Sequence, residues 1–121
     1  MLGRKIEEKT LSIPEVKKIM EDVKEKIMQI DPDEDMSTFQ KITYKYVNKF
    51  AKMSDKAAKK IRKLLIDKYN IEELYAVNII NIDPQTVPEL RIILEKSLVG
   101  KTFNDDQLQE ILYEIQELKN F

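Results

Sequence analysis

The sequence of 121 residues contains no cysteine, no histidine and no tryptophan, and it has only two glycines. Without cysteine the chain can form neither a disulfide framework nor a thiolate zinc site, and without histidine it lacks the commonest general base. The two glycines, Gly3 and Gly100, cannot build a glycine-rich phosphate loop. These absences weigh against an enzyme, and we predict no catalytic residue, no cofactor and no metal ion.

Long apolar segments are also missing. The longest uncharged apolar run is far shorter than the roughly 20 residues that span a membrane, and Met1 is not followed by a secretion leader. A chain of this length suits one domain, or one domain with an arm. We therefore expect a soluble, cytoplasmic protein without a membrane partner.

A net charge of -1 hides a strong partition of charge along the chain. Ten basic and two acidic residues lie between positions 39 and 70, whereas four basic and ten acidic residues lie between 71 and 121. This asymmetry indicates either a basic face for polyanions or mutual attraction between the two segments.

Helical periodicity predicts an all-α fold with six helices. Polar residues that suit the N-cap position begin four of them, namely Ser12, Ser54, Thr86 and Asn104. The expected spans are 12–31, 38–52, 55–68, 71–80, 86–100 and from 104 onward. Gly100 is expected to end the fifth helix in the left-handed conformation.

Apolar stripes on these helices predict the core. The helix at 38–52 presents Phe39, Ile42, Tyr46, Val47 and Phe50, and the helix at 71–80 presents Leu74, Val77 and Ile80. Tyr44 lies off its stripe and Phe121 is terminal, so we expect these two to contact something outside the fold.

The first eleven residues have no helical stripe and suggest an extended segment. An isolated strand is not stable in water, so its sheet would have to belong to another protein. A frayed terminus is the alternative, and the residues alone leave both open.

The helix at 55–68 has an outer face rich in lysine, which includes Lys56, Lys59, Lys60 and Lys63. Such a face is either simply solvated or in contact with nucleic-acid phosphate. No aromatic residue is interleaved with these lysines, which disfavours stacking on single-stranded bases.

Several segments, taken in order, resemble one family of transcription proteins. They are MLGRKI, the Ser12 and Pro14 helix start, FAKMSDKAAKKIRKLL, INIDPQTVPELRIIL and DDQLQEILYEIQELKNF. On these segments the chain resembles the smaller stalk subunit of archaeal DNA-directed RNA polymerase, whose counterpart is the smaller stalk subunit of eukaryotic nuclear polymerases. The resemblance covers nearly the whole chain, but the acidic loop at 31–36 and the lysine face depart from the family pattern.

The resemblance implies two parts. Residues 1–36 would be an N-terminal arm and helix that dock on the larger stalk subunit of the polymerase, and residues 37–121 would be a compact HRDC-like helical domain (helicase and RNase D C-terminal). It implies contacts to the larger stalk subunit from Leu2, Gly3, Arg4 and Ile6 in the arm and from Val16, Ile19, Met20 and Val23 in the helix.

Two functions of different classes follow. The first is a non-catalytic stalk subunit of DNA-directed RNA polymerase, which the resemblance describes as a heterodimer with the larger stalk subunit that aids DNA opening at initiation and handles nascent RNA. The second is a free-standing HRDC-like module that binds nucleic acid through the basic segment at 39–70. The second function would show steep salt dependence and would need no protein partner.

Overall fold

The computed structural model describes residues 10–31 and 36–120, and every regular element within them is helical. The six α-helices are α1 (Ile13–Ile30), α2 (Thr38–Phe50), α3 (Asp55–Lys63), α4 (Glu73–Ile82), α5 (Val87–Ile93) and α6 (Asp105–Lys119). The predictions of an all-α fold and of six helices are confirmed. The extended arm was predicted for residues that lie mostly outside the described ranges.

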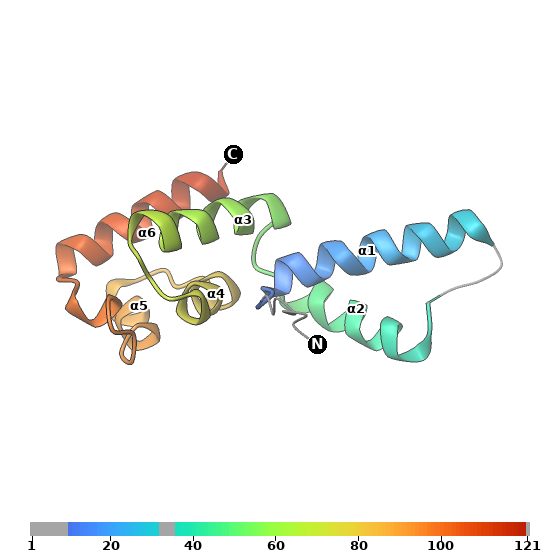
Figure 1. Ribbon diagram of the computed structural model, residues 1–121, viewed down its shortest axis with the longest axis horizontal. Coiled ribbons are helices and arrows are strands. Elements are labelled where there is room, and N and C mark those ends of the chain that lie inside the picture. The colour runs from blue at the N-terminus through green and yellow to red at the C-terminus, as the bar shows by residue number, and fades with distance from the viewer. Residues whose placement is uncertain (1–9, 32–35, 121) are drawn as a thin grey trace, which may run out of the picture.

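The helices form two groups (Figure 1). α1 and α2 lie antiparallel to one another and form a pair that we call the N-terminal hairpin, while α3 to α6 form a bundle at the other end of the molecule. The hairpin meets the bundle through the first turns of α1, which contact α3 and α4. α2 thus packs along α1, although the predicted boundary near residue 36 groups it with the bundle; that boundary stays a prediction.

Side-chain caps start α3, α5 and α6 at the positions that the sequence predicts. Backbone N–H groups donate to the side-chain oxygens of Ser54 (3.1 Å), Thr86 (3.3 Å) and Asn104 (2.8 Å). Ser37 caps α2 in the same way, with the Gln40 N–H donating to its hydroxyl at 3.2 Å. These bonds satisfy N–H groups that have no partner inside the helix, and they fix where each helix begins.

One apolar cluster fills the bundle. Its buried members come from α3, α4, α5, α6 and the segments beside them, and among the described residues none comes from α1 or α2. The largest fully buried side chains in it are Ile61, Leu65, Ile71, Ile79, Ile80, Leu90, Leu94, Leu108 and Ile111. The bundle therefore has a core of its own, and the hairpin lies outside that core.

Two left-handed residues end helices of the bundle. α3 runs into a π-helical turn, η1 (Leu64–Lys68), and Asn70, with φ of 57°, then lets the Ile71 N–H donate back to the Leu65 carbonyl at 3.0 Å. Asp83, with φ of 54°, ends α4, and its carboxylate accepts from Lys119 Nζ at 2.6 Å. This ion pair ties the end of α6 to the turn before α5.

Gly100 does not have the predicted role. α5 ends at Ile93, and Gly100 instead opens a short 3-10 turn, η2 (Gly100–Thr102). A Cβ at this position would lie 2.8 Å from Leu94 Cδ2 and 2.9 Å from Ser97 Oγ. Glycine is needed here because the chain passes close to these two side chains, so the prediction of a left-handed cap was wrong.

The predicted core faces of α2 and α4 also need correction. Of the five residues predicted for the core face of α2, four are exposed and only Val47 is buried, because the bundle does not cover this helix. In α4, Val77 and Ile80 are buried but Leu74 is exposed. Tyr44, which we expected to contact something outside the fold, is half-buried, with Lys24 Nζ 5.6 Å from its ring centroid, and the outside contact stays a prediction. Phe121 lies outside the described residues.

Candidate partner-binding site

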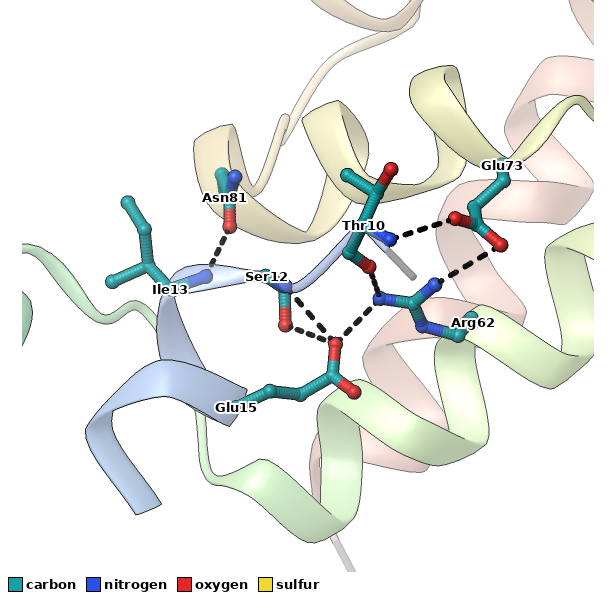
Figure 2. A network of polar contacts seen from close by, with 7 residues as sticks. All are labelled: Thr10, Ser12, Ile13, Glu15, Arg62, Glu73 and Asn81. Carbon is teal, nitrogen blue, oxygen red and sulfur yellow. Dashed lines mark hydrogen bonds and ion pairs between the residues drawn. The ribbon is translucent and has the colours of Figure 1, made fainter. Parts of the chain in front are cut away.

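A buried arginine fastens the N-terminal hairpin to the bundle (Figure 2). Arg62 of α3 points toward the first turn of α1, where its Nη2 donates to Glu15 Oε1 at 2.6 Å and to the Thr10 carbonyl at 2.5 Å. Both charged side chains are almost fully buried. Arg62 Nη1 also lies 3.7 Å from Glu73 Oε2 of α4. Because a buried ion pair is costly to break, this contact holds the two groups of helices together.

The Glu15 carboxylate closes the start of α1 as well. Its Oε1 accepts from the Ser12 N–H at 3.1 Å and from the Ser12 hydroxyl at 2.8 Å, which is the predicted capping arrangement. Burial acts to raise the pKa of Glu15, but the hydrogen bonds from Arg62 and Ser12 outweigh it and leave that pKa below its usual value. Glu15 is therefore ionised in the folded protein at neutral pH.

Two further contacts hold the segment before α1. The Thr10 N–H donates to Glu73 Oε1 at 3.0 Å, and the Ile13 N–H donates to Asn81 Oδ1 at 2.8 Å (Figure 2). Glu73 and Asn81 both belong to α4. Both backbone polar groups of Thr10 are thus bound by side chains of the bundle, which sets the direction in which the hairpin leaves it.

The four α1 residues predicted to dock on a partner differ in exposure. Ile19 is 43% exposed, whereas Val16, Met20 and Val23 are half-buried. Helical spacing places these three on one face of α1, and we infer that α2 covers that face. The arm residues predicted for the same contact, Leu2, Gly3, Arg4 and Ile6, lie outside the described residues. On α1, Ile19 is thus the most open of the predicted docking residues.

α2 contributes a larger apolar surface than α1. Phe39 is 77% exposed, Ile42 64% and Tyr46 55%, and Phe50 next to them is also exposed. The Tyr46 and Phe50 ring centroids lie 4.7 Å apart. A contiguous exposed apolar patch on a small protein marks an interaction site. We call these four residues the α2 stripe.

The predicted nucleic-acid lysines all lie in solvent. Lys56, Lys59, Lys60 and Lys63 are exposed on the side of α3 opposite the buried Ala58 and Ile61. Within the described residues, none of the four takes part in an ion pair. The structure places them on one helix, and they remain available to solvent or to a polyanion.

Two arrangements of polar side chains, the Ser12–Glu15 pair and the Tyr69 phenol, could be mistaken for catalytic groups. Ser12 donates to Glu15, but Ser12 is fully buried and the lowered pKa of Glu15 makes it a poor base. Burial and the nearby Glu114 carboxylate raise the pKa of Tyr69 to about 12, which takes this phenol further from proton transfer at neutral pH. Neither arrangement is suited to proton transfer at neutral pH.

The family of this chain follows from a match to a known family model. Residues 10–119 of the chain match the family model RNA polymerase Rpb4. The chain belongs to the RNA polymerase Rpb4 family. Members of this family are accessory, non-catalytic stalk subunits of DNA-directed RNA polymerase, which agrees with the resemblance seen in the sequence. A search of curated proteins gives no match.

The Rpb4 family match begins at residue 10, where the Arg62 contacts begin. Arg62 was missed because helical periodicity assigned it neither to the apolar face nor to the lysine face of α3. A signal was present: Arg62 is the single arginine among ten basic residues between positions 39 and 70. Arginine suits buried, multiply hydrogen-bonded ion pairs better than lysine.

Among the described helices, none combines the length and the apolar character that crossing a membrane requires.

Proposed function

We propose that this chain is the smaller stalk subunit of an archaeal-type RNA polymerase, and that it forms a heterodimer with the larger stalk subunit. In this role it connects to the polymerase core through the larger stalk subunit, supports DNA opening at initiation and assists with nascent RNA in the cytoplasm. Residues 37–121 would form the HRDC-like domain, and residues 1–36 would dock on the larger stalk subunit.

The observation that carries the proposal is that the N-terminal hairpin of this chain, a member of a polymerase stalk family, has an uncovered apolar side. The hairpin stands beside the bundle, contributes nothing to the bundle's core and exposes apolar side chains of both its helices. A pair of helices in this state is completed by another protein. Ile19, one of the residues assigned to the larger stalk subunit by resemblance, lies within this exposed surface.

We expect Ile19→Asp to weaken binding to the larger stalk subunit by roughly 10- to 100-fold, because a carboxylate in the centre of an interface is desolvated without a partner. Thermal unfolding of the isolated chain should change little, since Ile19 is already 43% exposed. Co-expression of the two subunits, followed by size-exclusion chromatography and titration calorimetry, measures both effects.

The matched control is Ile92→Asp, an equally drastic change at an exposed isoleucine of α5 in the bundle, which should leave pairing intact. A wild-type chain that stays monomeric beside its cognate larger stalk subunit would refute the proposed function. An equal loss of stability in the isolated Ile19→Asp chain would place Ile19 in the fold's own packing.

The lysine face supports a second function, contact with RNA phosphate. Replacing Lys56, Lys59, Lys60 and Lys63 with glutamine should weaken RNA binding at all sequences alike and reduce the salt slope by roughly 3, since each phosphate contact contributes about 0.7 to 0.9. Filter binding at two salt concentrations measures this. Lys96 and Lys101, exposed at the far end of the bundle, provide the control substitutions. Absence of wild-type affinity near physiological salt would exclude the function.

A further inference from the structure

The α2 stripe and Ile19 lie on the same side of the N-terminal hairpin. The contact between Lys24 and Tyr44 marks one edge of the seam between α1 and α2. At about 100° per residue, Ile19 and Ile30 project from the opposite edge of α1, and Phe39 and Phe50 project from the opposite edge of α2. Tyr46 and Ile42 continue the apolar surface from that edge toward the side of α2 away from α1. The exposed residues of the two helices therefore form one apolar surface that crosses the seam.

Charge on α2 is of one sign. The helix and its ends carry Lys41, Lys45, Lys49 and Lys52, and no aspartate or glutamate occurs from residue 36 to residue 54. Helical spacing places Lys45 and Lys49 beside the α2 stripe, on its side away from α1, and Lys49 Nζ lies 5.5 Å from the Phe50 ring centroid. The apolar surface thus has a basic border along one flank.

The hairpin is held ready for a partner by the bundle. Arg62 and the two α4 side chains fix the first turn of α1, and α2 is fixed in turn by packing along α1. A docking surface whose direction is set before binding loses less conformational entropy on association. The apolar surface therefore belongs to a pre-organised element.

We infer that the α2 stripe, with Ile19, is a docking surface for an apolar, acid-bordered protein surface on the larger stalk subunit. The inference rests on the proposed function and extends it, because the resemblance assigned the contact to the arm and α1 alone. Lys45 and Lys49 would then face carboxylates of the partner, which steer association and fix its register.

Two other occupants fit the surface less well. A second copy of this chain in a two-fold pair would bring the same lysine borders together, and like charges at an interface are unfavourable. Single-stranded nucleic acid would stack on aromatic rings among the lysines, but Ile42 stands in the centre of the stripe and Tyr44 is held in the seam.

The test is a double variant, Ile42→Ser with Tyr46→Ser, compared with Ile92→Ser with Leu98→Ser in the bundle, where the side chains are similarly exposed. We expect the α2 variant to weaken binding to purified larger stalk subunit at least 10-fold, while the bundle variant binds as wild type does. Neither should shift the thermal midpoint of the isolated chain by more than a few degrees, because all four side chains lie in solvent.

The outcomes separate the inference from the proposed function. Wild-type chain that fails to bind the larger stalk subunit overturns both. Normal pairing by the α2 variant, with wild type also pairing, overturns the docking surface alone. If the α2 variant pairs normally but loses self-association, the surface binds a second copy of this chain and the inference is overturned. If it pairs normally but loses binding to a single-stranded RNA oligonucleotide, the surface binds nucleic acid and the inference is likewise overturned.

Charge reversal gives an independent readout of the basic border. Lys45→Glu should slow association with the larger stalk subunit and flatten the dependence of the association rate on salt. Lys101→Glu in the bundle is the control for the change in net charge. Equal association rates for Lys45→Glu and Lys101→Glu would show that the border faces no carboxylates.

Discussion

Replacing Arg62 with alanine is expected to lower the free energy of unfolding by about 3–5 kcal/mol, the usual effect of removing one partner of a buried ion pair. The almost fully buried Glu15 carboxylate would lose the Arg62 guanidinium, and the Thr10 carbonyl would lose the hydrogen bond from Arg62. Urea unfolding followed by far-ultraviolet circular dichroism measures the change. We also expect faster amide hydrogen exchange in α1, since the hairpin would keep only the contacts of Thr10 and Ile13 with α4 among those described at its start.

The control for this prediction is the next residue, Lys63→Ala, an exposed side chain on the same helix that should change stability by no more than about 0.5 kcal/mol. Arg62→Lys should recover part of the loss, because an ammonium keeps the charge but cannot reproduce the guanidinium geometry. An Arg62→Ala protein whose stability lies within about 1 kcal/mol of wild type would mean that the ion pair does not hold the hairpin.

The pH dependence of the same contact follows from Glu15. Its folded pKa lies below the unfolded value, so its contribution to stability is complete above the unfolded pKa and is lost as pH falls through the folded pKa. The difference in stability between wild type and Arg62→Ala should therefore shrink in acid. A difference that stays constant down to about pH 3 would contradict the role of the ionised carboxylate.

Leu90→Ala is expected to destabilise the protein by about 2–5 kcal/mol, the range for removing a buried leucine and leaving a cavity. α5 has only seven residues, and a helix this short is not stable by itself. Leu90 is the fully buried residue of α5 and contacts the central cluster, so its side chain holds the helix in place. Urea unfolding is again the measurement.

The same helix supplies the control for Leu90. Ile92→Ala removes a similar volume from a side chain that is 71% exposed, and we expect it to be nearly neutral. A cost for Leu90→Ala no larger than that for Ile92→Ala would show that α5 is held by its ends, for instance by the ion pair between Arg91 and Asp105.

The sequence predicted the bundle well because its signals are local. N-caps at Ser54, Thr86 and Asn104 depend on residues three positions apart. The apolar residues of α6 recur at helical spacing, and Leu108, Ile111, Leu112 and Ile115 are accordingly buried. The ends of α3 and α5 were predicted less well. A π-helical turn and a close approach at Gly100 depend on tertiary packing that no single segment encodes.

The candidate site was harder to predict for a physical reason. Periodicity identifies an apolar face on α2 but does not say whether the same chain covers it. Only the packing of the hairpin shows that Val47 faces inward while Phe39 and Ile42 face solvent. The Arg62 contact joins residues 47 positions apart, a separation at which sequence spacing carries no information.

The open apolar side of the hairpin has a consequence for how the protein is supplied. A copy synthesised in excess of its partner exposes this hydrophobic surface to water, where such surfaces promote aggregation and degradation. We expect surplus chain to be degraded or to aggregate, so that the amount of folded protein that persists follows the amount of partner available to cover this surface. Balanced stoichiometry would in this way arise from surface chemistry alone, with no dedicated regulator.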